Sequence, residues 1–264
     1  MSRAQRLADG EVPDQVMQGH YARKQLGSRS RIIAWSHRQR LRMAARLVAP
    51  YAGQSLLDYG CGDGTFLGQI SPLFPHATGA DADAGQIDEC RTRFAHLTQV
   101  SFITTRELAG SQYDQRFGLI CCTEVLEHCV DSDVDHLLLD MDRLLAIDGS
   151  IIISVPIEIG PALIGKELIR AIAGWRRIGD YQHRDSYRWG ELFRMAGAGA
   201  ETAIARPAHP FGTGVAHSHK GFNWRRLRSQ IERRFVVREV RFSPFDGLAG
   251  WLSSQAWFRC ERLP

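Results

Sequence analysis

Apolar positions along the chain alternate between short continuous runs and longer stretches with a helical period. The runs predict strands at Ser55–Tyr59, Ala77–Ala80, Val100–Thr104, Gly118–Thr123 and Ser150–Val155. The periodic stretches between them predict helices at Thr65–Leu73, Ala84–Ala95 and Val134–Ala146. Strands that are apolar on both faces and separated by helices indicate a doubly wound α/β core built on a mostly parallel sheet.

The segments on either side of this core do not show its alternation of strands and helices. Residues 1–50 are predicted to form a basic helical N-terminal cap, with one or two amphipathic helices from Tyr21 to Val48, in front of a core that spans residues 51–156. Residues 157–222 are helical in pieces without a clear strand, which indicates an insertion that acts as a lid over the sheet edge.

The last part of the chain returns to the pattern of the core. Residues 223–264 contain a basic helix, Trp224–Arg234, and two strands, Phe235–Phe242 and Trp251–Cys260. A turn-rich link joins the two strands, so an antiparallel pair that closes the sheet is expected.

Charge divides the chain in the same way as the hydrophobic pattern. Residues 1–46 carry ten Lys and Arg against three Asp and Glu, residues 47–160 carry five against seventeen, and residues 161–264 carry eighteen against nine. An acidic middle between basic flanks indicates the charge of binding partners rather than a particular fold. A basic surface that is only solvated remains an alternative.

The six cysteines, together with the absence of long apolar segments, point to a cytoplasmic protein. No C-x-x-C pair is present, so reduced and mostly buried thiols are expected. No apolar run approaches the length of a spanning helix, and the basic first thirty residues have no apolar centre typical of a signal peptide.

The stretch "SLLDYGCGDGTFLGQI", residues 55–70, places three alternating glycines after the first strand. Glycines allow positive φ and close approach of the backbone to a ligand, and the next helix offers unpaired N–H groups. A dinucleotide fingerprint that starts at Gly60 requires Gly or Ala at position 65, where this chain has Thr65. The third glycine is Gly64, so a different nucleotide is expected.

This turn resembles motif I of the class I S-adenosylmethionine-dependent methyltransferases. The resemblance continues through "GADADAGQI", in which Asp81 matches the family's ribose-binding acid with Asp83 next best, and through "FGLICCTEVLEHCVD", whose "EVLEH" is typical of small-molecule and quinone O-methyltransferases. "HRDSYRWGELFRMAGA" is similar to a further element of the family, without its final aromatic residue.

The resemblance implies a Rossmann-like seven-stranded sheet, S-adenosylmethionine as the cofactor and S-adenosylhomocysteine as the product. Asp58 would face the methionine end of the cofactor, and Thr105 or Glu107 would lie near the adenine. The residues expected to bind the cofactor are Asp58, Gly60, Cys61, Gly62, Gly64, Asp81, Ala82, Thr105 and Thr123.

Methyl transfer from a sulfonium is a direct displacement, so much of its catalysis can come from alignment of the reactants. A hydroxyl acceptor also needs a base, and His128, a few residues after the fourth strand, is the first candidate, with Glu124 or Glu127 to orient it. A capping role for His128 remains open, and His183, His217 and His219 are alternative bases. No metal site is predicted, because Asp131, Asp133 and Asp135 read as the acidic first turn of a helix.

The acceptor must be inferred from the lid. Basic residues there favour an anionic, small or lipid-linked metabolite, such as a glycan precursor, a quinone-like ring or a natural product. The expected substrate-binding residues are His183, Arg184, Tyr187, His219 and Lys220, with Arg170, Arg176 and Arg177 as further clamps. The segment "PALIGKELIRAIAGWRR" suits either a helix that touches anionic lipid at the inner membrane face or a helix packed on the sheet.

Two alternative functions remain open at this point. Arginines interleaved with tryptophans would suit an RNA methyltransferase, although no amino-methylating N/D-P-P-Y/F motif follows the fourth strand. A non-catalytic S-adenosylmethionine-binding protein would be expected to have lost the glycine turn or the ribose acid, and both are present. Nucleic acid is therefore not the expected partner, and the oligomeric state is not predicted.

Overall fold

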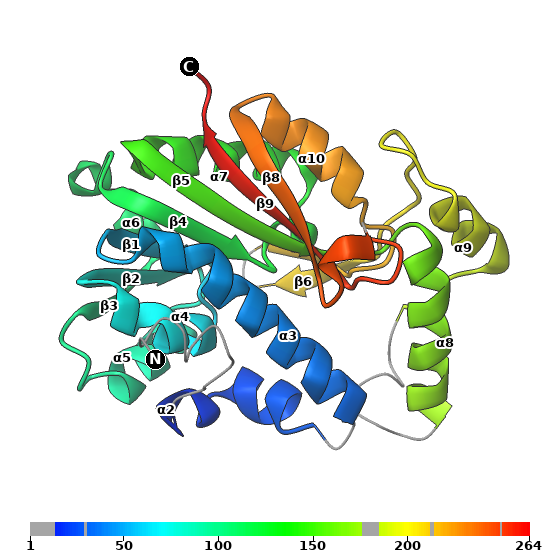
Figure 1. The fold of residues 1–264 in the computed structure, drawn as a ribbon, viewed down its shortest axis with the longest axis horizontal. Helices are drawn as coiled ribbons and strands as arrows, with labels where there is room; N and C mark the ends of the chain where they lie inside the picture. The colour runs from blue at the N-terminus through cyan, green and yellow to red at the C-terminus, as the bar shows by residue number, and fades with distance from the viewer. Residues whose placement is uncertain (1–13, 29–30, 176–184, 212–213, 249) are drawn as a thin grey trace. The chain divides into compact units, whose positions relative to one another are not determined.

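A computed structural model describes residues 14–28, 31–175, 185–211, 214–248 and 250–264 of the chain (Figure 1). Its helices are α2 (Asp14–Met17), α3 (Arg31–Val48), α4 (Thr65–Ile70), α5 (Ala84–Arg93), α6 (Thr105–Leu108), α7 (Asp131–Leu144), α8 (Pro161–Trp175), α9 (Trp189–Ala196) and α10 (Trp224–Glu232). Its strands are β1 (Ser55–Tyr59), β2 (His76–Asp81), β3 (Val100–Thr104), β4 (Phe117–Thr123), β5 (Leu145–Pro156), β6 (Ala208–Phe211), β7 (Gly214–His217), β8 (Phe235–Ser243) and β9 (Gln255–Arg262).

Seven strands form one mostly parallel sheet in the order β3-β2-β1-β4-β5-β9-β8. β1 pairs in parallel with β2 on one side and β4 on the other, with Asp58 opposite Gly79 and Cys121. Leu56, Leu57 and Tyr59 are buried, as expected for a central strand covered on both faces. The predicted α/β class with flanking helices is therefore confirmed.

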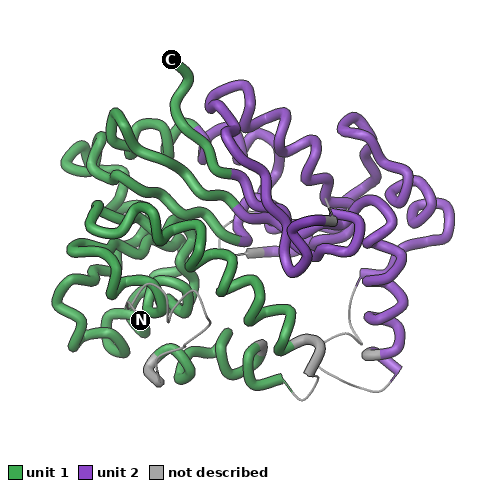
Figure 2. The backbone as a smooth tube through the Cα atoms, in the orientation of Figure 1, with its two compact units in different colours: residues 1–123, 139–153, 259–264 green, residues 124–138, 154–258 purple. Residues whose placement is uncertain are grey.

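The chain divides into two compact units, which are coloured separately in Figure 2. Unit 1 comprises residues 1–123, 139–153 and 259–264, and unit 2 comprises residues 124–138 and 154–258. The glycine turn belongs to unit 1, and the segment that follows β4 belongs to unit 2.

Two predictions about secondary structure were wrong. The insertion contains a separate antiparallel pair, β6 and β7, in which Ala208 pairs with His217 and Pro210 with Val215. Four-residue strands with a proline and a glycine give too short an alternation to be recognised in the sequence. The final strand also begins at Gln255, four residues later than predicted, because Trp251 and Leu252 are exposed in the preceding turn.

The cysteines match their prediction, since all six are free of disulfides and only Cys129 is not fully buried. Among the described residues, no helix is long and apolar enough to cross a membrane.

Candidate functional site

The glycine turn of unit 1 leaves the buried strand β1 and begins α4. Gly60, Gly62 and Gly64 have φ values of 78°, 52° and 69°, a region that only glycine adopts without strain. The backbone N–H groups of Gly60 and Cys61 both donate to the carbonyl oxygen of Ala80, at 2.7 and 3.0 Å. These bonds fix the turn against the last residues of β2.

Gly64 is required for a second reason besides its backbone angle. A Cβ atom at this position would lie 2.9 Å from the ring of Phe94, 3.1 Å from that of Phe102 and 3.2 Å from the sulfur of Cys90. Gly64 also occupies the N-cap position of α4. The backbone therefore passes close to packed side chains where the turn becomes a helix.

The two predicted ribose acids have different surroundings. One carboxylate oxygen of Asp81 accepts from the N–H of Gly62 at 2.8 Å, and the other accepts from the N–H of Asp83 at 3.0 Å. The carboxylate of Asp83 caps α5 by accepting from the N–H groups of Gly85 and Gln86, and these bonds lower its pKa. The carboxylate of Asp83 is therefore occupied by the N-terminus of α5. Each oxygen of Asp81 accepts one N–H and retains a lone pair that can accept a hydroxyl hydrogen.

Asp58 is a buried carboxyl group at the carboxyl end of β1. Only 1% of it is exposed, and burial, followed by the neighbouring charge of Asp81, raises its pKa to about 8. Within the described part of the chain, neither of its oxygens has a hydrogen-bond partner. An amino or sulfonium group of a bound ligand would supply the cation that this carboxyl lacks, so the site fits the positively charged methionine end of S-adenosylmethionine.

The other residues predicted to bind the cofactor lie at the ends of the parallel strands. Ala82 follows β2, Thr105 begins α6 directly after β3, and Thr123 is the last residue of β4. Cys61 is buried within the turn. Glu107, an alternative near the adenine, is bound to Thr104 in a capping box, which favours Thr105 for that position.

The segment after β4 begins unit 2 and carries the predicted catalytic residues. Glu124 has φ 60°, a left-handed conformation that is uncommon for a residue with a side chain, and its N–H donates to the carbonyl of Ser154 at 3.0 Å. A single 3-10 turn, Leu126–His128, follows. The Glu127 side chain is buried, and Nδ1 of His128 lies 2.8 Å from the backbone oxygen of His217.

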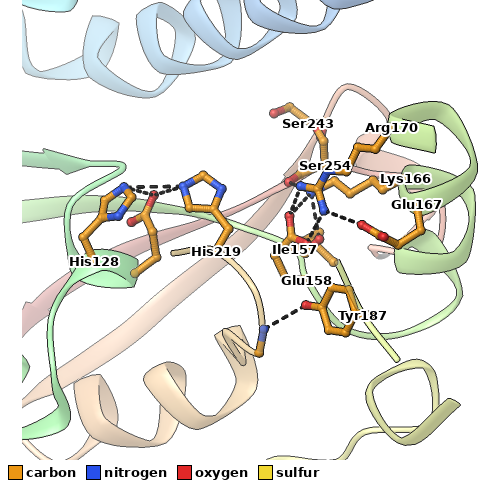
Figure 3. A network of polar contacts seen from close by, with 12 residues as sticks. His128, Ile157, Glu158, Lys166, Glu167, Arg170, Tyr187, His219, Ser243 and Ser254 are labelled. Atoms are coloured by element: carbon orange, nitrogen blue, oxygen red, sulfur yellow. Dashed lines mark hydrogen bonds and ion pairs between the residues drawn. The ribbon is translucent and has the colours of Figure 1, made fainter. Parts of the chain in front are cut away.

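This turn brings His128 and Glu127 together with His219, which lies 91 residues further along the chain than His128. The Nε2 atoms of the two histidines are 3.4 Å apart (Figure 3). Each of these atoms is 3.9 Å from Oε1 of Glu127. Burial lowers the pKa of His219 to about 4, so its imidazole is neutral at physiological pH. Three such side chains, all within unit 2, could hold a metal ion.

Arg206 connects the two segments that carry this cluster. Its guanidinium donates to the backbone oxygens of Glu127 and Cys129 on one side and to that of Ser218 on the other. The same guanidinium stacks over the ring of Phe222 at 5.4 Å. No sequence pattern selects Arg206, because the carbonyl groups that it binds come from two distant segments.

A second charged network of unit 2 centres on Glu158, which is fully buried. Nζ of Lys166 lies 2.9 Å from its carboxylate, and Arg170 binds both carboxylate oxygens at 2.7 and 2.8 Å (Figure 3). These cations outweigh the effect of burial and lower the pKa of Glu158 to about 2. The guanidinium of Arg170, predicted as a substrate clamp, is therefore occupied by Glu158 and Glu167.

The remaining predicted substrate residues are only partly described. The hydroxyl of Tyr187 accepts from the N–H of Gly221 at 2.8 Å, and Lys220 pairs with Glu191 at 2.8 Å. His183, Arg184, Arg176 and Arg177 lie outside the described residues. His217 contributes a backbone oxygen to the cluster, while its ring faces the carbonyl of Pro207 at 3.2 Å.

The acidic turn at the start of α7 has the role that its sequence suggests. Asp131 and Asp133 lie in the first turn of α7. Asp131 pairs with Arg226 at 2.7 Å, and Asp135 pairs with Arg233 at 3.2 Å. Asp131 and Asp135 therefore form surface ion pairs within unit 2.

Comparisons with known proteins find similar sequences and similar folds. The family model described as a methyltransferase domain matches residues 31–198. A ubiquinone biosynthesis O-methyltransferase of Chelativorans sp. (strain BNC1) is 29% identical over 202 residues, which cover 74% of each chain. Another protein of that name, from Mesorhizobium japonicum, is 26% identical over 201 residues, covering 74% of this chain and 76% of its own.

Solved structures share the fold at low sequence identity. The PH0226 protein of Pyrococcus horikoshii OT3 has a TM-score of 0.60 at 13% identity and covers 95% of this chain and 100% of its own. The N-methyltransferase NodS from Bradyrhizobium japonicum WM9, in complex with S-adenosyl-L-homocysteine, has a TM-score of 0.52 at 16% identity and covers 99% and 97%.

These matches do not favour an RNA methyltransferase or a non-catalytic binding protein. The family model covers more than half of the chain, including the glycine turn, Asp81 and the segment after β4. The chain therefore belongs to the methyltransferase domain family and is a class I S-adenosylmethionine-dependent methyltransferase.

Proposed function

We propose that this methyltransferase transfers the methyl group to a hydroxyl oxygen of a small aromatic acceptor that carries an apolar tail. The observation that carries the proposal is the cluster of Glu127, His128 and His219, which places two imidazoles and a buried carboxylate together. Such groups can bind a hydroxyl and remove its proton. An amine acceptor that is already neutral needs no group of this kind.

The segments that follow strands β1 and β4 support binding of the acceptor at this cluster. Ligands of open parallel sheets bind beyond the carboxyl ends of the strands. β1 leads into the glycine turn at Gly60, and its neighbour β4 leads into the segment Glu124–His128. The first segment suits the cofactor, and the second suits the group that receives the methyl.

The reaction is one displacement. S-adenosylmethionine supplies the methyl group as a sulfonium. The glycine turn and Asp81 would hold the nucleoside, and Asp58 would face the positively charged methionine end. The acceptor oxygen attacks the methyl carbon while the carbon–sulfur bond breaks, and the electron pair stays on sulfur as a thioether. A phenol has a pKa near ~10, so its hydroxyl must lose a proton at neutral pH before or during the attack.

The relatives support the aromatic class of acceptor. Four matching curated proteins carry the name ubiquinone biosynthesis O-methyltransferase, and this chain covers 74% or more of the first three. Ubiquinone is a quinone, so the name indicates a ring oxygen as the methylated atom in those proteins. We extend this class, rather than one particular compound, to the present chain.

The exposed face of α8 supports an apolar tail and contact with a membrane surface. Leu168 is 63% exposed and Trp175 is 81% exposed, and Ile164, Ile169 and Ile172 are exposed on the same helix. Lys166 and Arg170 of α8 instead turn to the buried Glu158. The sequence continues with Arg176 and Arg177, so the apolar helix is followed at once by cations suited to anionic lipid.

The acceptor class is tested by methyl transfer from labelled S-adenosylmethionine to three matched compounds: a prenylated phenol, the same phenol without its tail, and the corresponding prenylated aniline. We expect the label on the oxygen of the prenylated phenol and a higher KM for the phenol without the tail. Asp81→Ala provides the inactive control. Preferential labelling of the aniline, or no labelling of either phenol, would contradict the proposal.

Membrane contact is tested by sedimentation with vesicles that contain phosphatidylglycerol. Leu168→Glu should reduce binding to the vesicles and leave methylation of the short phenol unchanged. Ile147→Glu is the matched control, since Ile147 is 72% exposed but lies on β5, outside α8. Equal loss of binding in the two variants would refute a specific role for α8.

A further inference from the structure

We infer that unit 2 contains a second ligand site, a cavity that binds a small apolar monocarboxylic acid and acts on the turn after β4 through Arg206. The cavity is lined by the first turn of α7, by α10 and by the loop before β6, all of unit 2. None of Glu127, His128 and His219 is among the described residues that line it. Binding follows from the geometry of unit 2 alone, whereas the effect on catalysis rests on the proposed O-methyl transfer.

The cavity has the size and the construction of a small-molecule site. Its volume is about 470 Å³, and pockets for small ligands have ~300–1,000 Å³. Its floor is apolar and buried, because Leu126, Phe222 and Leu227 are each at most 5% exposed. Asp131 and Arg226 also line the cavity and are exposed, so it opens to solvent beside them.

One buried amide fixes the wall between the loop before β6 and α10. The side-chain oxygen of Asn223 accepts from the N–H groups of Arg225 and Arg226 and so caps α10. The side-chain nitrogen of Asn223 donates to the carbonyl oxygens of Gly199 and Thr202 at 2.8 and 2.9 Å. The cavity is therefore formed before a ligand binds, as is usual for small-molecule sites.

Arg206 is a half-buried cation that lines the cavity without a counter-charge of its own. Its guanidinium contacts the backbone oxygens of Glu127, Cys129 and Ser218, which carry no formal charge. Its Nε is buried without a hydrogen-bond partner, and within the described part of the chain the guanidinium forms no ion pair. Burial lowers the pKa of Arg206 despite the opposing charge of Asp131. A bound anion would supply the charge that this cation lacks.

Two contacts of Arg206 are weak enough for a ligand to replace. Its Nη1 lies 3.4 Å from the carbonyl oxygen of Cys129, and its Nη2 lies 3.5 Å from that of Ser218. Hydrogen bonds from nitrogen have donor–acceptor distances of ~2.7–3.2 Å, so both contacts are long. A carboxylate offers two oxygens to the planar guanidinium and forms shorter, charge-assisted bonds.

The charges around the cavity favour an acid with a single negative charge. Arg206, Arg226 and Asp131 line it, which gives two positive groups against one negative group and a net charge of +1. Arg226 is already paired with Asp131 at 2.7 Å, so the charge of Arg206 is the one left to a ligand. A phosphate monoester carries ~1.5–2 negative charges at pH 7, and Asp131 would repel the excess.

Arg206 also links the cavity to the proposed catalytic residues. Its guanidinium contacts the backbone oxygen of Glu127, next to His128, and that of Ser218, next to His219. A carboxylate that draws the guanidinium into the cavity would break the contact with Ser218. Occupancy should therefore separate the two segments that carry the histidines and slow methyl transfer.

Calorimetry with the full chain compares three probes of different charge: octanoate, octanamide and octyl phosphate. These chains have no aromatic ring and so do not resemble the proposed acceptor. We expect one octanoate per chain and at least ~10-fold weaker binding of the neutral amide, which cannot pair with Arg206. Octyl phosphate should also bind more weakly than octanoate, and Asp131→Asn should reduce that difference.

Three variants locate the site. Arg206→Met should weaken octanoate binding by ~10–100-fold, because a charge-assisted pair is lost. Arg228→Met is the matched control, since Arg228 of α10 pairs with Glu232 at 2.7 Å and does not line the cavity. Ala203→Phe keeps the test decisive if Arg206→Met fails to fold. Ala203 is an exposed lining residue, so the added ring can fill the cavity and abolish binding without entering the core.

Cys129 reports the position of the bound acid independently of the calorimetry. It lines the cavity and is the only cysteine of the chain that is not fully buried. Saturating octanoate should slow its alkylation by N-ethylmaleimide, which mass spectrometry of the intact chain measures. The site would be overturned by a wild-type chain that binds no stoichiometric octanoate, by equal affinity of Arg206→Met and Arg228→Met, or by unchanged alkylation of Cys129.

Activity tests the link to the turn separately from binding. Octanoate should lower kcat for the prenylated phenol at unchanged KM in the wild type, and it should have no effect in Ala203→Phe. Unchanged kcat in saturating octanoate would overturn the link through Arg206. Inhibition that excess phenol relieves would overturn a separate site, since the acid would then occupy the acceptor site. If no phenol is methylated but octanoate binds as described, the proposed acceptor class is wrong and the cavity site stands.

Discussion

Two buried carboxyl groups, one in each unit, have opposite electrostatic surroundings. Asp58 of unit 1 has a pKa raised to about 8 by burial and by Asp81. Glu158 of unit 2 has a pKa lowered to about 2, because Lys166 and Arg170 outweigh its burial. The chain supplies the cations for Glu158, whereas Asp58 has no hydrogen-bond partner among the described residues.

We propose that the difference separates a structural charge from one that serves a ligand. A buried ion pair that is complete within the chain fixes the positions of its own elements, here the middle of α8 and the segment that follows β5. A buried carboxyl without a cation lowers stability when it ionises, and it is retained where a ligand provides the opposite charge. S-adenosylmethionine carries that charge.

The largest effect should come from breaking the complete pair. Glu158→Gln leaves Lys166 and Arg170 with buried charges, which should cost about 3–5 kcal/mol in the free energy of unfolding measured with urea. Asp58→Asn is the matched change in unit 1 and should instead stabilise the ligand-free chain at pH 7, since the wild-type carboxyl is ionised in the unfolded chain and must take up a proton to be buried. Similar losses in the two variants would contradict the distinction.

The pH dependence of stability should show the same contrast with opposite signs. The pKa of Glu158 is lowered on folding from 4.5 to about 2, so its contribution of about 3 kcal/mol is present above pH ~4.5 and is lost as the pH falls toward 2. The pKa of Asp58 is raised from 3.8 to about 8, so its contribution is fully present below pH ~3.8 and is lost as the pH rises from there through 8.

Urea unfolding across this pH range, with the two variants in parallel, separates these contributions. Glu158→Gln should flatten the acid limb of the stability profile, and Asp58→Asn should flatten the decline in stability between pH ~4 and ~8. An acid limb that is identical in wild type and Glu158→Gln would show that other carboxylates determine it.

Cofactor affinity should respond to Asp58 and not to Glu158. Replacement of Asp58 by Asn removes a charged acceptor worth ~1.5–3 kcal/mol, so S-adenosylmethionine should bind about 10- to 100-fold more weakly in calorimetry. A neutral analogue without the amino group should bind wild type and Asp58→Asn equally. A variant that binds S-adenosylmethionine as tightly as wild type would remove Asp58 from the cofactor site.

The smallest predicted effects distinguish two glycines. Gly64→Ala places a Cβ at φ 69° against Phe94 and Phe102 and should destabilise the chain by ~1–3 kcal/mol. Gly165→Ala, in α8 with no atom within 4 Å of the added carbon, should stabilise it by ~0.5–1 kcal/mol. Thermal unfolding of both variants checks the contrast, and a neutral Gly64→Ala would show that the turn tolerates a side chain.

The turn that we propose for the cofactor could be predicted from the sequence because its residues are close together along the chain. Gly60, Gly62 and Gly64 form one turn, and Asp81 follows at the end of the next strand. The strand order and the resemblance to a known motif were enough to place them at one edge of the sheet.

The histidine cluster could not be predicted in the same way. His219 and Glu127 were separate candidates in the sequence, and only tertiary structure brings them to 3.9 Å. The short strands β6 and β7, which place the carbonyl of His217 beside His128, give no clear alternation. Contacts between residues that are distant in the chain, and hydrogen bonds to backbone carbonyl groups, produce no recognisable pattern in a single sequence.

The most direct test of the account is the number of protons released when S-adenosylmethionine binds. Calorimetry at pH 7 in buffers of different ionisation enthalpy measures that number. A cation that binds beside Asp58 lowers its pKa from about 8, so release of close to one proton is expected, with none from Asp58→Asn. Binding without proton release, or the same release from Asp58→Asn, would contradict the assignment of this carboxyl to the cofactor.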